Sequence, residues 1–356
     1  MLLTILSFVF VLGILIFIHE LGHFLVAKRV GIRVEKFSLG FPPNIFSRTF
    51  GDTTYCIGVI PLGGYVKMAG EHPEDGQTGA PDEFMSKSVW QRAAVIFAGP
   101  FMNYVLAIFL LIGIVYSTGQ PRYDEGRILV GQVSEDSPAA GAGLLEGDQI
   151  IGLNGEQVSQ FDSLRTRLNG FVSEEIELIW IHEGDTVSQK MTTMTVPTLT
   201  EDGEIDSVGI IGFRQHAVGY DRFGLVESAQ RGFIGAHVIV YETVRFVKQL
   251  VTGQISGKMV GGPLFIAQQS GKEARKGAFF LFRFMALLSV NLAVINVLPI
   301  PVLDGGQLVF LAVEKIKGGP LSLKARAISQ QIGILVVLTV VLAVTYNDIV
   351  RVFKGL

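Results

Sequence analysis

Three side chains within a long apolar stretch have the types and spacing of a metal-dependent hydrolase site. Leu2–Arg29 is almost wholly apolar, yet it contains His19, Glu20 and His23. Residues four apart lie on the same face of a helix, so both histidines can direct an imidazole to one metal ion while Glu20 flanks it. Two such ligands and a carboxylate that serves as general base are the components of a zinc hydrolase. Chance matches to His-Glu-x-x-His are frequent, but a Glu at bilayer depth costs roughly 2.5–3.5 kcal/mol and needs compensation.

A third metal ligand is expected from a distant part of the chain. Catalytic zinc takes three protein ligands and keeps one position for water. Near the end of another apolar stretch, Pro299 and Pro301 must break a helix, and Asp304 follows them. Taken alone, Asp304 is more typical of a helix cap or a loop acid. Together with the two histidines it completes a predicted Zn²⁺ site in which the glutamate is the catalytic base.

The composition places these residues in a membrane protein. Of the 356 residues, 49% are hydrophobic and only 17% are charged, and the mean hydropathy is positive. Such a chain is too apolar for an ordinary soluble enzyme. No basic stretch interleaved with aromatic residues occurs, so nucleic acid is not an expected partner. The single cysteine, Cys56, excludes an internal disulfide and is interpreted as a packing residue.

Apolar segments of sufficient length predict about four transmembrane helices. Their expected ranges are Leu2–Ala27, Ala93–Tyr116, Ala278–Ile300 and about Ile328–Tyr346. Basic residues follow the first span and separate the third from the fourth, so the positive-inside rule places these connections in the cytoplasm. The metal site then lies within the membrane near its cytoplasmic face, and the segment between the second and third spans is extracytoplasmic. Lys272, Arg275 and Lys276 oppose this orientation locally.

A β-hairpin region is predicted at residues 32–70, between the first and second spans. Alternating and β-branched residues punctuated by glycine and proline are typical of strands and turns. An exposed edge of this hairpin would let it hold an extended substrate by strand addition; the alternative is an ordinary surface hairpin. The second span carries Gly99, Pro100 and Asn103, whose amide either braces a metal ligand or bonds a neighbouring helix.

The extracytoplasmic segment has a pattern that resembles a PDZ domain. Ser-Pro-Ala-Ala at 137–140, Gly-Asp-Gln-Ile at 147–150 and Asn-Gly at 154–155 occur in the order of a small-residue helix, a strand and a turn. The segment has room for one such domain, whose groove would bind a peptide or chain terminus unless the domain acts as a steric sieve. After it, Phe223–Gly257 has helical periodicity, with an apolar face opposite charged residues. This pattern favours an interfacial helix over a fifth span.

The expected fold is an α-helical integral membrane protein with about four transmembrane helices, a membrane-associated β-hairpin and one extracytoplasmic α+β PDZ domain. Residues 1–118 form the first half of the membrane core and include the hairpin region. Residues 119–222 form the PDZ domain and residues 223–277 an amphipathic linker. Residues 278–356 form the second half of the membrane core.

The chain resembles the site-2 protease family of intramembrane zinc metalloproteases, of the bacterial regulator-of-sigma-E protease type. The similarity rests on His19-Glu20-Leu21-Gly22-His23 and on Asn296-Val297-Leu298-Pro299-Ile300-Pro301-Val302-Leu303-Asp304-Gly305. It extends to Gly63–Met68, Gly99–Asn103 and Gly262–Leu264. Two features depart from the family. Members from enteric bacteria carry tandem PDZ domains, and the frequent Gly-Phe-Gly-Pro segment here reads Gly40-Phe41-Pro42-Pro43.

The resemblance implies regulated intramembrane proteolysis by a multi-pass protein of the bacterial inner membrane, surrounded by membrane lipid. Its implied substrates are single-pass membrane proteins, such as an anti-sigma factor in an envelope stress response or remnant signal peptides. It implies also that the substrate is held by Asn291 and Asn296 and presented by the hairpin residues Gly63, Gly64, Tyr65 and Val66. Pro299 and Pro301, which mark the helix break, complete the predicted substrate site.

Two other functions use the same residues. A non-catalytic PDZ-bearing receptor would use the polar intramembrane residues for packing, and would need neither a metal nor Glu20. A metal-ion carrier would use His19, His23 and Asp304 as a transit site. Such a carrier needs polar residues through both halves of the membrane, and the outer halves of these spans are nearly without them.

Overall fold

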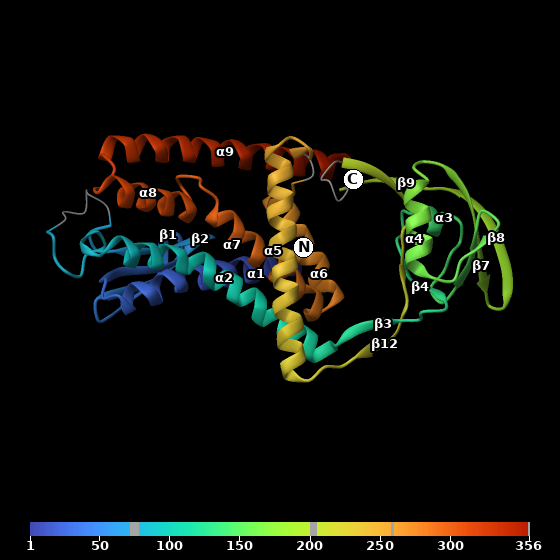
Figure 1. The fold of residues 1–356 in the computed structure, drawn as a ribbon. Helices are drawn as coiled ribbons and strands as arrows, with labels where there is room; N and C mark the ends of the chain where they lie inside the picture. Colours follow the sequence, from blue (N-terminus) through green and yellow to red (C-terminus); the bar gives the residue numbers. More distant parts are fainter. Residues whose placement is uncertain (72–77, 200–204, 258–259, 355–356) are drawn as a thin grey trace. The chain divides into compact units, whose positions relative to one another are not determined.

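The computed structural model describes residues 1–71, 78–199, 205–257 and 260–354. The chain forms two compact units (Figure 1). The first unit contains Met1–Ile114, Val226–Lys248 and Ser256–Leu356, and the second contains Val115–Leu225 and Gln249–Ile255. Each unit has its own buried apolar residues, and each is described by itself.

Long helices dominate the first unit. They are α1 (Leu2–Arg29), α2 (Val89–Thr118), α5 (Leu225–Val251), α6 (Pro263–Lys276), α7 (Ala278–Val297), α8 (Asp304–Lys317) and α9 (Leu323–Lys354). Within the described part of the chain, four helices are long and apolar enough to cross a membrane: α1, α2, α7 and α9. The prediction of about four spans is therefore confirmed, and the chain is a multi-pass membrane protein by helix length and composition.

Some helix boundaries differ from the predicted ones, because local backbone chemistry ends a helix where hydropathy does not. α7 ends at Val297, three residues before the predicted end, since Leu298 precedes Pro299 and takes an extended conformation (ψ 146°). α9 is longer than its apolar centre, because polar helix formers continue it in both directions. Neither α6 nor α8 was predicted from the sequence. Both helices start after glycine- and proline-rich segments, which are typical of turns.

Small side chains bring α2, α5 and α7 together. Ala107, Ala286 and Val290 are fully buried at the centre of this contact, and apolar residues of α5 pack around them. Residues without bulk allow membrane helices to approach closely. α5, yellow in Figure 1, crosses α2 and α7 in this unit. The predicted amphipathic helix thus exists and packs on two of the apolar helices; its position at the membrane interface stays a prediction.

A small sheet lies between α1 and α2 in the chain, as predicted. It consists of β1 (Val34–Phe50) and β2 (Thr53–Met68), both of which bend. Residues 36–39 of β1 have strand partners on both sides. On one side residue 36 pairs with residue 67 and residue 39 with residue 64. On the other side residue 36 pairs with residue 54 and residue 39 with residue 57. Residues 41–50 of β1 pair with residues 53–60. Residues 64–68 therefore form an outer edge of the sheet, with one strand partner among the described residues.

The second unit is rich in β-structure. Its elements are β3 (Gln120–Tyr123), β4 (Ile128–Val133), α3 (Pro138–Gly141), β5 (Gln149–Leu153), β6 (Glu156–Gln157), α4 (Phe161–Gly170), β7 (Glu175–His182), β8 (Asp185–Thr192), β9 (Met194–Leu199), β10 (Ile205–Ile210), β11 (Phe213–Gln215) and β12 (Ala217–Asp221). The main sheet has the order β11-β4-β5-β7-β8, with β6 on β5. Trp180 and Leu164 are buried in its core. α3 and β5 confirm the predicted small-residue helix and the predicted strand. The PDZ assignment stays a prediction.

Candidate metal centre

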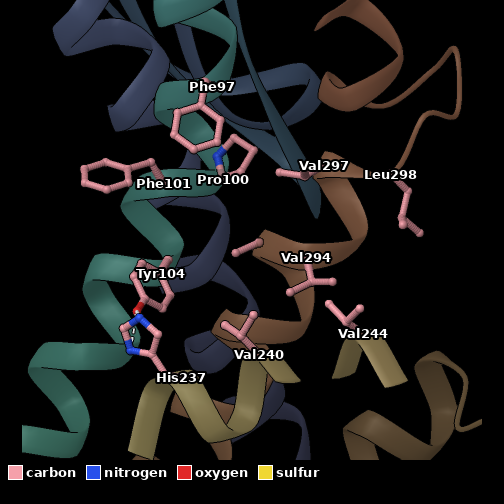
Figure 2. Close-up of a pocket in the computed structure, with 11 residues that line it drawn as sticks. Phe97, Pro100, Phe101, Tyr104, His237, Val240, Val244, Val294, Val297 and Leu298 are labelled. Carbon is pink, nitrogen blue, oxygen red and sulfur yellow. Dashed lines mark hydrogen bonds between the residues drawn. The ribbon is translucent and has the colours of Figure 1, made fainter. Parts of the chain in front are cut away.

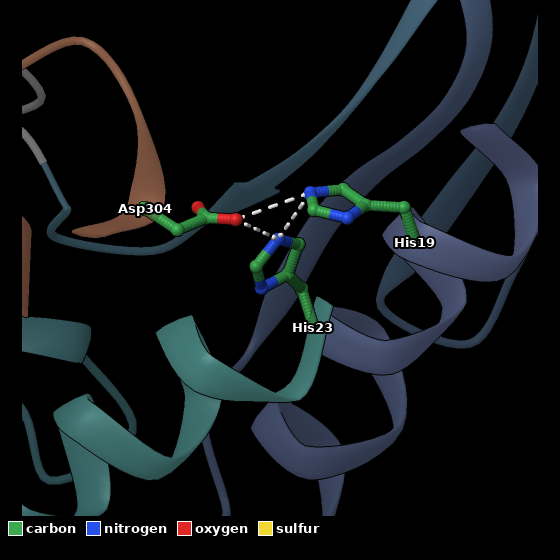
Figure 3. Close-up of side chains that lie close together, drawn as sticks. All are labelled: His19, His23 and Asp304. Atoms are coloured by element: carbon green, nitrogen blue, oxygen red, sulfur yellow. Dashed lines mark hydrogen bonds and ion pairs between the residues drawn. The ribbon is translucent and has the colours of Figure 1, made fainter. Parts of the chain in front are cut away.

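His19, His23 and Asp304 lie together although nearly the whole chain separates the pair from the aspartate (Figure 3). His19 Nε2 is 3.2 Å from Asp304 Oδ2 and 3.2 Å from His23 Nε2, and His23 Nε2 is 3.6 Å from the same carboxylate oxygen. The two histidine side chains are 12% exposed and the aspartate 20%. Three electron-pair donors thus converge at one partly enclosed point.

The geometry of this cluster fits a zinc ion. Zinc–ligand bonds of about 2.0–2.1 Å in a tetrahedron place ligand atoms about 3.3 Å apart, close to the observed separations. Asp304 Oδ2 is buried and receives no hydrogen bond from the residues that the structure describes. His19 Nε2 lies 3.2 Å from this oxygen without hydrogen-bond geometry. A cation would therefore compensate a carboxylate oxygen that is otherwise unsatisfied.

One face of α2 supports the two histidines of α1. The carbonyl oxygen of Val95 lies 2.8 Å from His23 Nδ1, and the Asn103 amide lies 3.3 Å from His19 Nδ1. Gly99, between them, leaves room for both rings: a Cβ at this position would lie 2.3 Å from His23 Nε2. The spacing of these three residues, four apart, places them on one face of the helix. Metal-binding histidines usually have such a partner at the second ring nitrogen.

A sharp reversal of the chain places Asp304. The residue opens α8 after the Pro299–Pro301 break, and Leu303 caps that helix in an extended conformation. Gly305 packs directly against the end of α7, where a Cβ would lie 2.1 Å from the carbonyl oxygen of Val297. Only glycine permits this approach, so α8 folds back beside α7 and its first residue reaches the histidines.

A buried ion pair ties the other end of α8 to α2. Arg92, near the start of α2, donates hydrogen bonds to Glu314 from both terminal nitrogens of its guanidinium group. Nη1 lies 3.1 Å from Oε2, and Nη2 contacts Oε1. The side chains are 5% and 15% exposed. Removing one partner of a buried pair leaves an uncompensated charge, so this contact fixes how α8 lies against α2.

Glu20 contacts the outer edge of the β1–β2 sheet. A Cβ at Gly64 would lie 2.9 Å from Glu20 Cγ, 2.9 Å from an Ile16 methyl carbon and 2.9 Å from the carbonyl oxygen of Ser38. The predicted general base and the predicted substrate-presenting edge are therefore in direct contact. The hairpin thus comes to the metal centre rather than lying elsewhere on the surface.

The other predicted hairpin residues are held by aromatic contacts. Gly63 lies against the Phe41 ring, which also stacks on Tyr65 with centroids 6.4 Å apart. Val66 pairs with Phe37 of β1. These residues shape the edge that runs past Glu20, and their role in binding a substrate stays a prediction.

The predicted substrate-binding residues after the hairpin are spread over different surroundings. Asn291 accepts a hydrogen bond of 2.8 Å from Thr243 of α5, so its amide oxygen is directed to that helix. Asn296 lies in the last turn of α7 and is partly exposed. Pro299 is exposed, whereas Pro301 packs against Gly306 and Gly333. The role of these four residues in binding a substrate stays a prediction.

An apolar cavity of about 440 Å³ lies between α2, α5 and α7 (Figure 2). The cavity shares residues with the surroundings of the metal centre. Pro100, which follows Gly99, lines the cavity. Val297 and Leu298 also line it, and their carbonyl oxygens lie against Gly305. Figure 2 shows its aromatic residues on α2 facing valines of α5 and α7. The hydroxyl of Tyr104 lies 3.0 Å from His237 Nδ1 at its edge. The size is that of a ligand pocket.

Several residues that contact the predicted site residues were not predicted, because they use a backbone atom or lie on another helix. The Val95 carbonyl has no signature in the sequence, since any residue supplies one. Thr243 and Ser289, which bond Asn291 and the Asn103 carbonyl, are isolated hydroxyls in helical segments. Only Gly99 and Asn103 carried a signal, namely small and amide residues inside an apolar span.

Apolar helices around a His–His–Asp cluster with an adjacent glutamate describe a membrane-embedded metal hydrolase. A sequence profile described as Peptidase family M50 matches residues 7–340, and the chain belongs to this family. The zinc metalloprotease RasP of Geobacillus kaustophilus is 30% identical, with 98% of each chain covered. A putative zinc metalloprotease of Rhizobium meliloti is 34% identical over 97% of this chain and 96% of its own. The regulator of sigma-W protease RasP of Bacillus subtilis is 30% identical over 98% and 99%.

Two solved PDZ domains are similar to a part of the chain. The PDZ domain of an SdrC-like protein from Listeria monocytogenes matches 26% of this chain and 88% of its own, with 18% identity and a TM-score of 0.21. A second PDZ domain, from Listeria innocua, matches 27% with 20% identity and the same TM-score.

Membership in this family establishes the type of enzyme. The chain is a zinc metalloprotease of the site-2 protease family, and Zn²⁺ is its expected cofactor. The receptor and carrier functions are therefore not supported.

Proposed function

We propose that this protein hydrolyses peptide bonds within the transmembrane segments of single-pass membrane proteins, with His19, His23 and Asp304 as zinc ligands and Glu20 as catalytic base. The observation that carries the proposal is the convergence of three ligands on apolar helices beside a glutamate that touches a sheet edge. A protease site that lies within the membrane acts on substrates that are themselves in the membrane.

The reaction divides between the metal and the protein side chains. The chemistry that zinc supplies in such a site is polarisation of the scissile carbonyl and acidification of a water molecule. The Glu20 carboxylate accepts a proton from the attacking water and later delivers it to the departing amide nitrogen. Its position beside Gly64 brings this proton transfer next to a backbone edge that can align a peptide.

Substrate binding follows from the sheet edge and the cavity. A transmembrane helix satisfies its own backbone hydrogen bonds, so the segment to be cut must unwind and find new partners. Residues 64–66 lie at an outer edge of the sheet, where a strand of the substrate can be added. The cavity on the α2–α7 side then receives apolar side chains of the unwound segment. Asn291 and Asn296 hold the freed backbone through their side-chain amides.

The biological setting is proposed from charge and from a relative. Basic residues after α1, in the last turn of α8 and in the first turn of α9 favour a cytoplasmic side for the metal centre, with the PDZ domain outside the bacterial inner membrane. The name of the Bacillus subtilis relative, regulator of sigma-W protease, supports a membrane-bound anti-sigma factor in an envelope stress response as substrate. The PDZ groove is proposed to bind a peptide or a chain terminus.

The decisive experiment compares the detergent-purified protein with its Glu20→Gln variant for zinc content and for cleavage of a single-pass model substrate. We expect one zinc per chain in both, with cleavage by the variant reduced by at least about 100-fold, the range of general base catalysis. Glu227→Gln, the same change at an exposed residue of α5, is the control. Undiminished cleavage by Glu20→Gln, or loss of its zinc, would contradict the assigned role.

A further inference from the structure

The Asn103 amide is buried beside the metal centre and one of its ends is unsatisfied. Asn103 is 0% exposed, and its Nδ2 lies 3.3 Å from Nδ1 of His19. Its Oδ1 has no hydrogen-bond partner among the described residues. A buried polar atom without a partner costs about 1–3 kcal/mol. Since the two ends of an amide have the same shape, their assignment follows from the hydrogen-bond network.

The hydrogen bond of His23 shows which tautomer a metal-binding imidazole must adopt. A backbone carbonyl can only accept a hydrogen bond, so the 2.8 Å contact with Val95 requires a hydrogen at His23 Nδ1. The lone pair of the neutral ring is then at Nε2, which faces Asp304. The second nitrogen thereby fixes which nitrogen is available to a metal.

His19 has the same requirement but no carbonyl partner. Its Nε2 faces the cluster, so its Nδ1 must carry the hydrogen and must find an acceptor. With Nδ2 toward the ring, Asn103 would donate to Nδ1, and the ring hydrogen would occupy the nitrogen that faces Asp304. A half-turn of the amide instead places Oδ1 at His19 Nδ1, where it can accept this hydrogen, and moves Nδ2 to the position that Oδ1 held.

We propose that Asn103 Oδ1 accepts a hydrogen bond from His19 Nδ1–H and thereby keeps Nε2 of His19 free to bind the metal. Asn103 is a positioning residue, and this inference rests on the zinc site of the proposed function. The amide and the Val95 carbonyl have equivalent roles, one for each histidine, on the two sides of Gly99.

The connection of Asn103 to the neighbouring helix is made by its backbone, which leaves the side chain for His19. Ser289 of α7 donates a hydrogen bond of 2.7 Å to the Asn103 carbonyl oxygen, and both residues are fully buried. This bond holds the turn of α2 that carries the amide. It also allows packing to be tested separately from the contact with His19.

The test uses substitutions that distinguish an acceptor from a donor. Asn103→Leu has similar size and can neither accept nor donate, while Asn103→Asp can accept but, when ionised, cannot donate. Ser289→Ala removes the helix-to-helix bond and leaves the amide intact. Zinc affinity of each detergent-purified variant is measured by competition with a chelator, and the absorption spectrum of the Co²⁺-substituted protein reports the ligand geometry.

We expect Asn103→Leu to bind zinc about 10–100-fold more weakly, the usual effect of losing such a partner. Asn103→Asp and Ser289→Ala should stay within a few-fold of the wild type, with unchanged Co²⁺ spectra. Equal losses in Asn103→Asp and Asn103→Leu, or wild-type affinity in Asn103→Leu, would overturn the inference. If the Leu variant does not fold, retained affinity in Asn103→Asp supports it and lost affinity overturns it. A folded wild-type protein that binds no zinc would refute the proposed function itself, and this inference with it.

Discussion

Gly99→Ala should disable the metal centre without unfolding the protein. An added Cβ would lie 2.3 Å from His23 Nε2, 2.5 Å from His23 Cε1 and 2.9 Å from His19 Cε1. Ordinary contact begins at 3.4 Å, so the His23 ring must move by about 1 Å. His23 cannot simply rotate away, because its other nitrogen is held at the Val95 carbonyl.

The magnitude follows from the tolerance of a metal site. Zinc–ligand distances hold within about 0.2 Å, and the required movement is several times larger. We therefore expect zinc affinity to fall by about 100-fold or more, which corresponds to roughly 3 kcal/mol. Alanine is a better helix former than glycine by about 1 kcal/mol, so α2 itself should persist.

The assay is chelator competition for zinc, together with cleavage of a single-pass model substrate and thermal unfolding of the same preparations. Gly113→Ala is the matched control, since it lies on the same helix and an added Cβ has no neighbour within 4 Å. It should keep zinc affinity and activity. Wild-type zinc affinity in Gly99→Ala would refute the reasoning, because it would mean that the two rings do not occupy the space beside this glycine.

Two further predictions concern the sheet edge and the second unit. Gly64→Ala would place a methyl group 2.9 Å from Glu20 Cγ, so we expect kcat/KM to fall by up to about 100-fold with zinc affinity unchanged; Gly13→Ala, with open space on α1, is the control. In the second unit, the Asp148 carboxylate, 2.7 Å from His182 Nδ1, raises the pKa of this imidazole above its ordinary value. The folded pKa exceeds the unfolded one, so the pair stabilises the unit fully below about pH 6.5 and loses this contribution as pH rises through the folded pKa. His182→Gln should therefore lower the denaturant midpoint at pH 5.5 and much less at pH 8.5.

The unfolding of the second unit can be followed by tryptophan fluorescence. Trp180 is buried in the second unit and Trp90 is exposed, so a Trp90→Phe background makes tryptophan fluorescence report on that unit alone. His216→Gln is the control, since its ring is 3.8 Å from Glu146, beyond hydrogen-bond distance. A midpoint change equal at both pH values would argue against the His182–Asp148 linkage, and loss of zinc in Gly64→Ala would argue that the edge acts on the ligands rather than on Glu20.

The sequence by itself determined the elements that local chemistry and hydropathy encode. His19, Glu20 and His23 at helical spacing in an apolar stretch predicted a metal-binding pair and a base, and apolar length predicted the spans. Alternation and turn residues predicted the hairpin region, and the order of motifs predicted α3 and β5 of the second unit. Each of these depends on residues close together in the chain, so the pattern is visible without a fold.

Only the tertiary structure decided how distant residues meet. α8 was not predicted, yet its first residue, Asp304, lies at the histidines because Gly305 packs against the end of α7. Asn291 was predicted to hold substrate, and the structure shows its amide engaged by Thr243 of α5. The Val95 carbonyl and the unsatisfied oxygen of Asn103 are likewise invisible in sequence. Contacts through backbone atoms and across helices depend on packing geometry rather than on residue type, and a single sequence does not encode them as a local pattern.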